Sequence, residues 1–184
     1  MANNISFDLT APGAKKAIIK FVIRLAILFT IWHLIYGQFL VKSGVIERPL
    51  TNIITFSVVQ TINFLSPSTK QIAWAENLPK KNDYLILNDQ KVFVIGYACA
   101  GLNLMFTYVS VILLLPYPLK RKLVFSIGGI LIIILANIIR ITALYYIYVY
   151  QKNAFDFNHH YLFTILMDIL IFYGWLLFIK KKKV

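Results

Sequence analysis

The sequence is poor in cysteine, and this limits the chemistry it can support. Its one cysteine, Cys99, excludes a disulfide within the chain and any cysteine-based metal cluster. No group of residues reaches a credible set of metal ligands, so we predict neither a metal nor another cofactor. A lone cysteine is then either an inert packing residue or a reactive thiol.

Hydrophobic residues, by contrast, make up 59% of the 184 residues. A soluble domain contains about 45–50%, so the chain is predicted to be an integral membrane protein. The net charge of +12 would suggest nucleic acid in a soluble protein, but here the basic residues gather at the ends of apolar runs. Such clusters mark the cytoplasmic side of a membrane protein, which assigns 120–122 and 180–183 to the cytoplasm and predicts no nucleic-acid partner. No cleavable signal is evident at the amino terminus.

We therefore predict one integral membrane domain over residues 1–184. Its fold class is all-α, a polytopic transmembrane bundle of about four to five helices, with a small extracytoplasmic β-hairpin before the helix that carries Cys99. The turn residues Asn88 and Asp89 separate the two hairpin strands. The predicted segments are helices at 17–41, 46–65 (amphipathic or spanning), 99–115, 122–150 and 160–179, with the hairpin segment at 66–96.

The segment 46–65 has an apolar stripe at helical spacing and a polar side that includes Asn52, Gln60 and Asn63. Its length permits a span. If the first helix starts in the cytoplasm, however, a second crossing puts Cys99 on the cytoplasmic side. We therefore favour a segment that lies in the interface or re-enters the membrane over an external amino terminus.

Cys99, Arg140 and a histidine are predicted at one depth. Arg140 lies about 27 Å above the basic cluster that starts its helix, and His159 and His160 lie about 30 Å above the basic cluster that ends theirs. Cys99 is at the outer end of the preceding helix. An arginine within a span is a functional-site hypothesis by default, because a buried charge is costly in lipid.

These residue types together predict acyl transfer through a thioester. A nearby cation favours the Cys99 thiolate, a neutral histidine moves the proton, and Arg140 stabilises a developing oxyanion. Gly101 allows the close approach of an extended peptide. Asn137 projects from the same helix face as Arg140. We assign Asn137, Gly101 and the polar Asn103 to substrate positioning.

Each residue also has a simpler interpretation. Cys-Ala-Gly is compatible with close helix packing through small residues. Arg140 is compatible with a side chain that reaches the outer headgroups. The two histidines are compatible with the interfacial start of a helix. It is their occurrence at one depth that favours a site.

Three short motifs in this order resemble those of the exosortase/archaeosortase family. They are Cys99-Ala-Gly followed by Leu102, the Asn-x-x-Arg pattern that ends at Arg140, and Asn158-His-His at a helix start. The resemblance covers about residues 96–175 and is to the compact members of Gram-negative bacteria. Many members have more spanning helices than this chain.

The resemblance implies a multi-pass transpeptidase-like enzyme of the bacterial inner membrane. Its partners would be the lipid bilayer and exported proteins that carry a carboxy-terminal sorting signal, namely a short motif, a transmembrane helix and a basic tail. Cys99 would be the nucleophile, Arg140 the stabiliser, and His159 or His160 the acid and base. Two alternatives stay open: a non-enzymatic assembly subunit that packs through Gly128 and Gly129, and a membrane acyltransferase.

Overall fold

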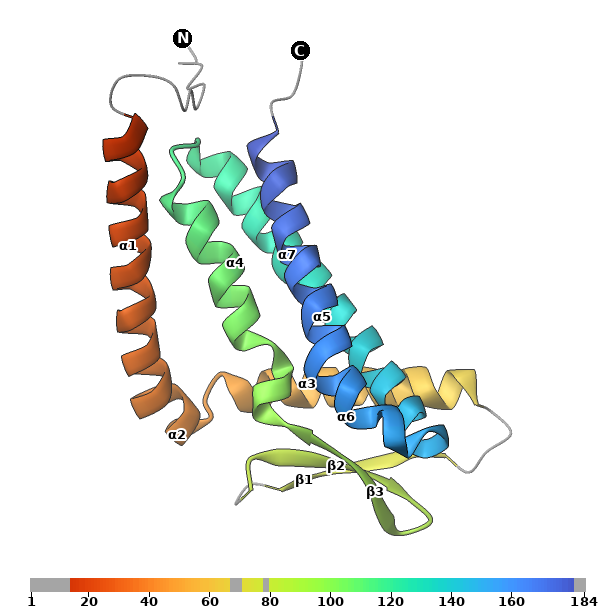
Figure 1. The fold of residues 1–184 in the computed structure, drawn as a ribbon. Helices are drawn as coiled ribbons and strands as arrows, with labels where there is room; N and C mark the ends of the chain where they lie inside the picture. Colours follow the sequence, from red (N-terminus) through yellow and green to blue (C-terminus); the bar gives the residue numbers. More distant parts are fainter. Residues whose placement is uncertain (1–13, 67–70, 78–79, 181–184) are drawn as a thin grey trace.

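The structure is a computed structural model that describes residues 14–66, 71–77 and 80–180 of the chain. A helical bundle stands on a layer made of one crosswise helix and a small sheet (Figure 1). This arrangement confirms the predicted fold class. The elements are α1 (Ala14–Ile35), α2 (Val41–Ser43), α3 (Glu47–Leu65), β1 (Ala73–Asn77), β2 (Asn82–Leu87), β3 (Gln90–Gly96), α4 (Leu102–Leu114), α5 (Leu119–Tyr150), α6 (Phe155–Phe157) and α7 (Phe163–Ile179).

Three helical stretches of the described chain are long and apolar enough to cross a membrane, namely Lys15–Leu40, Leu119–Tyr150 and Lys152–Ile179. Each of them is at least 26 residues long, whereas a span needs about 20. The apolar helix α4 has only 13 residues, about 20 Å, and is shorter than the hydrocarbon core. The protein is therefore a multi-pass membrane protein in which α4 is the short member of the bundle.

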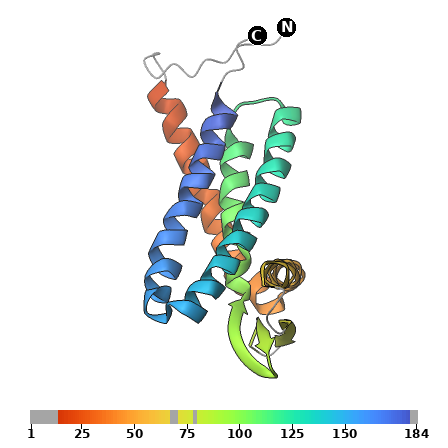
Figure 2. The ribbon, with the colours of Figure 1, turned by 90° about the vertical axis from the view of Figure 1, so that its right-hand side faces the viewer.

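Helix α3 runs across one end of the bundle and is seen end-on in Figure 2. Its buried residues Ile54, Val58 and Ile62 recur every four positions, so one face of the helix is covered. That face packs against α5 and the sheet. That α3 lies in the membrane interface stays a prediction.

The sheet is antiparallel, with strand order β1-β2-β3. Asn88 and Asp89, the predicted turn residues, both have positive φ, at 54° and 61°, as a two-residue hairpin turn requires. The hairpin therefore formed where the sequence predicted it. Strand β1 was not predicted, since its short sequence AWAEN lacks the run of β-branched residues that marks a strand. It is held by pairing along β2.

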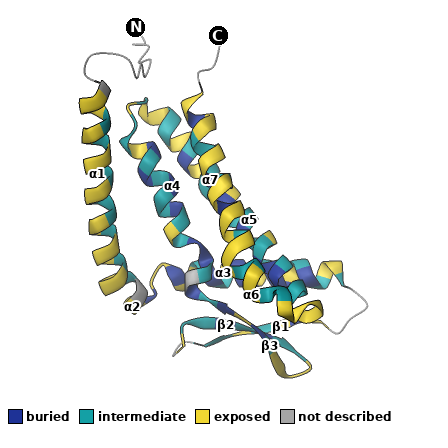
Figure 3. Cartoon of the chain, in the orientation of Figure 1, coloured by how far each residue is buried: buried dark blue, intermediate teal, exposed yellow. Residues whose placement is uncertain are grey.

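The apolar side chains form two cores at different heights. The first joins α3, the sheet and the last turns of α5, through residues such as Ile54, Leu85 and Tyr145. The second lies inside the bundle, between α4, α5 and α7. The described side chains of α1 include no buried residue of either core, and Figure 3 shows the helix exposed along most of its length.

Two of the predicted helices begin at other residues in the structure. The helix predicted at 122–150 already begins at Leu119. Pro118, with φ of −58°, precedes that first turn, and its fixed φ is compatible with a helix start. The helix predicted at 99–115 begins only at Leu102, because residues Tyr97–Ala100 form a 3₁₀ turn.

Candidate active site

Cys99 lies in a tight connection between the sheet and the bundle. The 3₁₀ turn that holds it follows β3 directly and ends at Gly101, whose φ of +79° is in the left-handed region. A Cβ at Gly101 would lie 3.4 Å from the Asn137 side chain, in ordinary contact, so it is the left-handed conformation that favours glycine here. Ala100 is fully buried, which anchors the turn against the core. The Cys99 side chain itself is half-buried.

Asn137 of α5 holds the backbone of this turn. Its side chain is 0% exposed, and its Nδ2 donates a hydrogen bond to the Cys99 carbonyl oxygen at 2.6 Å. Its Oδ1 is buried and has no hydrogen-bond partner among the described residues. Asn137 therefore contacts the connection between Cys99 and Gly101 from the bundle side, on the helix that also carries Arg140.

Cys99, Arg140 and His159 line one small cavity of about 40 Å³. Three separate elements bring them there: the 3₁₀ turn before α4, the carboxy-terminal part of α5, and the helical segment that precedes α7. The rest of the lining is apolar and comes from β3, α5 and α6, at Phe93, Val94, Ile95, Ile141, Leu144 and Phe155. A thiol, a guanidinium and an imidazole therefore share a mostly apolar hollow, where charge interactions are stronger than in water.

Arg140 is half-buried in this cavity wall. Its Nε is buried, and among the described residues it has no hydrogen-bond partner. A buried guanidinium N–H without a protein partner is costly, and a ligand oxygen in the cavity would satisfy it. The side chain is thus suited to bind a carbonyl oxygen or an anion next to Cys99.

The two histidines have different surroundings. His159 is half-buried, lines the cavity, and stacks on Phe155 with a ring separation of 5.5 Å. His160 is exposed, does not line the cavity, and meets His159 edge to face at 4.6 Å. Both lie in the π-helical turn Asn158–Leu162, a local geometry that is frequent at functional sites. The i, i+4 spacing of Phe155 and His159 was a signal for their stacking that the sequence analysis did not use.

Asn103 lies outside the cavity. It is exposed on the first turn of α4, and its Oδ1 accepts a hydrogen bond from Trp32 Nε1 of α1 at 3.1 Å. Of the predicted positioning residues, Gly101 and Asn137 thus contact the Cys99 turn, while Asn103 joins two helices. A role for Asn103 in substrate positioning stays a prediction.

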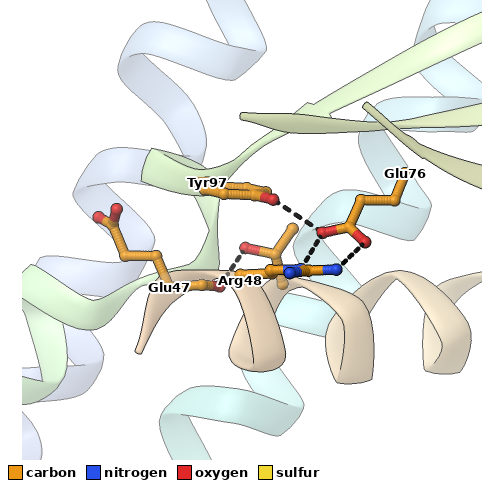
Figure 4. Close-up of polar contacts among 5 residues, drawn as sticks. Glu47, Arg48, Glu76 and Tyr97 are labelled. Carbon is orange, nitrogen blue, oxygen red and sulfur yellow. Dashed lines mark hydrogen bonds and ion pairs between the residues drawn. The ribbon is translucent and has the colours of Figure 1, made fainter. Parts of the chain in front are cut away.

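A polar cluster supports the Cys99 turn from the other side (Figure 4). Arg48 of α3 donates to both carboxylate oxygens of Glu76, at 2.6 and 3.0 Å, and the Tyr97 hydroxyl donates to Glu76 at 2.9 Å. The hydrogen bond from Arg48 lowers the pKa of Glu76. Burial and the bond to Glu76 raise the pKa of Tyr97 to about 12, so the hydroxyl stays a donor at neutral pH.

The cluster matters because Tyr97 opens the turn that carries Cys99. It ties α3 and β1 to that turn through one carboxylate. The cluster has no signal in the sequence, since Arg48 and Glu76 lie 28 residues apart and no spacing rule connects a helix to an unpredicted strand. In the described part of the chain, no three His, Cys, Asp or Glu side chains gather as a metal site.

The fold and this cavity define a class: a multi-pass helical membrane protein with a cysteine, an arginine and a histidine in one hollow near the end of its bundle. A family model described as transmembrane exosortase matches residues 16–179. The chain belongs to the transmembrane exosortase family, which confirms the resemblance drawn from the three motifs. No curated protein and no solved structure was found to match it.

Proposed function

We propose that this protein is a membrane-embedded cysteine peptidase or transpeptidase that cleaves the carboxy-terminal sorting signal of exported proteins. Membership of the exosortase family supports a sorting enzyme of this kind. The observation that carries the chemical assignment is the shared cavity of Cys99, Arg140 and His159. A thiol at that position, with a base and an oxyanion stabiliser beside it, is suited to cleave a peptide bond.

In the proposed reaction, His159 takes the proton from the Cys99 thiol, and the thiolate attacks the carbonyl carbon of the scissile peptide bond. The tetrahedral intermediate collapses to a thioester, the carbon–nitrogen bond breaks, and His159 returns the proton to the leaving amine. Water or an amine then attacks the thioester carbonyl, and the thiol is restored. No redox partner is needed, since each bond that forms replaces one that breaks.

Arg140 is proposed to stabilise the oxyanion of that intermediate. Its buried, unpartnered Nε is a donor that a substrate oxygen would satisfy. Asn137 is proposed as a positioning residue, because its contact is with the Cys99 backbone. Gly101 serves the same turn through its left-handed conformation, and Asn103 would position the substrate farther along α4.

His159 is the better acid and base of the two histidines. It lines the cavity with Cys99, and its stacking on Phe155 holds the ring in place. His160 is exposed beside it and does not line the cavity. We assign the proton transfer to His159 and use His160 as its matched control.

The proposed setting is the bacterial inner membrane, with the active site near the extracytoplasmic face. The amino-terminal end of α1, the link between α4 and α5, and the end of α7 lie together at one end of the bundle (Figure 1). Lysines and arginines of the described chain are concentrated there, at 15–20, at 120–122 and at Lys180. The positive-inside rule assigns that end to the cytoplasm, which supports an external position for the cavity.

The experiment is a processing assay with candidate exported proteins that end in a short motif, a transmembrane helix and a basic tail. Wild-type protein should shorten its substrate. The Cys99→Ala variant should insert into the membrane normally but leave the substrate intact. The His160→Ala variant is the control for a change near the site. If the Cys99→Ala variant still shortens the substrate, the nucleophile assignment is wrong.

A further inference from the structure

A second hollow runs along the bundle on the side where α1 and α7 flank α4. It has a volume of about 450 Å³ and is lined by apolar side chains. Ile18 and Phe21 of α1 form one wall, Phe172 and Trp175 of α7 form the other, and Val111 of α4 lies on its floor. Figure 1 shows α4 between α1 and α7, the three helices that supply most of this lining.

The groove exists because α1 packs on α4 mainly near one end. There, Trp32 stacks on Phe106 with a ring separation of 3.9 Å and donates to Asn103. Towards the basic end, Ile18 and Phe21 face the groove instead of a neighbouring helix, and α1 gives no buried residue to either core. The space between α1 and α7 is thus a helix-lined face of the bundle that no described residue fills.

The groove lies in the half of the bundle nearest the basic residues, and its lining stops short of the proposed active site. At one end its floor is Val111 of α4, about 14 Å along that helix from Leu102, and Cys99 precedes Leu102. Its other end reaches Ile18 and Ile179, close to the basic residues at the ends of α1 and α7. A helix of about 20 residues seated in the groove would extend past Val111 along α4 and reach the level of Cys99.

An acidic residue lies in line with the groove wall. Asp168 is exposed on α7, one turn before Phe172, and the spacing to Phe172, Trp175 and Ile179 puts all four on one helix face. A carboxyl group on a spanning helix is costly against hydrocarbon tails, and such residues usually face protein or water. Lipid tails offer Asp168 no hydrogen bond, whereas a polar side chain on a second helix does.

We propose that this groove binds the transmembrane helix of the substrate. The substrate residues that precede this helix would then lie beside Cys99. The inference rests on the proposed function, which requires a peptide bond and an adjoining spanning helix to bind together. The apolar walls fit the apolar face of that helix, and Asp168 fits a polar side chain within it. Close packing and interhelical hydrogen bonds are the forces that join helices in lipid.

Photo-crosslinking of the full chain in lipid vesicles tests the proposal. The probe is a synthetic peptide with a polar head, a helix of about 20 Leu and Ala residues and a four-lysine tail. A benzophenone amino acid replaces Phe172 in one variant and Tyr173 in the other. Both side chains are aromatic and 58% exposed, but consecutive residues point about 100° apart and Tyr173 does not line the groove.

The groove predicts about tenfold more cross-linked peptide from position 172 than from position 173. A second peptide carries one asparagine twelve residues before its tail, level with Asp168 relative to Lys180. With Asp168 present, this second peptide should give more cross-linked product at position 172 than the first peptide. With Asp168→Leu added, the two peptides should give equal yields. Equal yields from the two positions, adducts with lipid alone, or adducts between two copies of the protein would overturn the proposal.

The readout also separates the two proposals. Cross-linking needs no cleavage, so it is unaffected by an error in the role of Cys99. A protein that shortens its substrate but shows no preference for position 172 has the proposed activity without the groove. A protein that captures the peptide at position 172 but shortens no substrate has the groove without the proposed chemistry.

Discussion

The two hollows of this protein differ in size, lining and surroundings. The Cys99 cavity is about 40 Å³ and is lined in part by a thiol, a guanidinium and an imidazole, next to a core that joins α3, the sheet and α5. The groove between α1 and α7 is about 450 Å³, apolar, and bordered by a helix that neither core includes. Catalysis requires a few side chains in fixed positions, whereas binding of a helix requires a long surface that is open to it.

The comparison predicts that substitutions in the cavity abolish turnover but spare helix docking. A large loss of turnover is expected for Arg140→Lys, because a planar donor fork is replaced by a point charge. The processing rate should fall by about 10²–10³-fold, as for removal of an oxyanion donor. Rates of substrate shortening measure this.

Arg24 of α1 supplies the matched control for that variant, since it is an exposed arginine on another helix and does not line the cavity. Arg24→Lys should process substrate at the wild-type rate. An Arg140→Lys protein that keeps full activity would show that Arg140 serves only to reach the headgroups.

The histidine pair gives a sharper test within one turn of helix. His159→Ala should lower the processing rate by about 10²–10⁴-fold, because the proton carrier is lost. His160→Ala should be nearly silent, since that ring is exposed beside the cavity. The same assay compares the two variants, and the opposite order of effects would reassign the proton transfer to His160.

The groove predicts a different kinetic effect. Val111→Trp should fill its floor and raise the KM for substrate by about tenfold while kcat stays near wild type, because binding in the ground state and the transition state is lost equally. Leu113→Trp places the same bulk on an exposed side of α4 outside the groove and is the control. An unchanged KM in both variants would argue against docking there.

Asp83 gives the smallest effect, on stability rather than activity. It is fully buried between β2 and α3, and burial raises its pKa above the ordinary value. In the folded state the Asp83 carboxyl group therefore keeps its proton to a higher pH than in the unfolded state. The free energy of unfolding then falls as the pH rises from the ordinary pKa of the group to the raised one.

Asp83→Asn should remove that dependence and stabilise the protein at neutral pH, with a rise in Tm of about 2–4 °C for each kcal/mol recovered. Thermal unfolding across this pH range measures it. A variant that is less stable than wild type at neutral pH would mean that the ionised carboxylate is stabilised by its surroundings.

Much of this architecture was predictable, because its signals are local. Apolar runs bounded by lysines predict the long helices, and Asn88 with Asp89 predicts the hairpin turn. The rise per residue of a helix also predicts Cys99, Arg140 and a histidine at one depth, and three such side chains line one cavity.

Other features depend on contacts between distant segments and have no local signal. The bond from Arg48 to Glu76 joins a helix to strand β1, which is held mainly by its pairing with β2. The difference between His159 and His160 depends on a π-helical turn, which shifts the faces that adjacent residues present. The groove needs the position of α1 relative to α7, which no pattern within either helix determines.

The most direct test of the central claim is mass spectrometry of the protein trapped during turnover with a candidate sorting-signal substrate. The proposed mechanism predicts a covalent adduct on Cys99 with the mass of the substrate fragment that precedes the cleavage site. The adduct should be released by hydroxylamine, as a thioester is, and be missing in Cys99→Ala. Substrate turnover with the acyl group on another residue, or without any covalent adduct at Cys99 under trapping conditions, would contradict it.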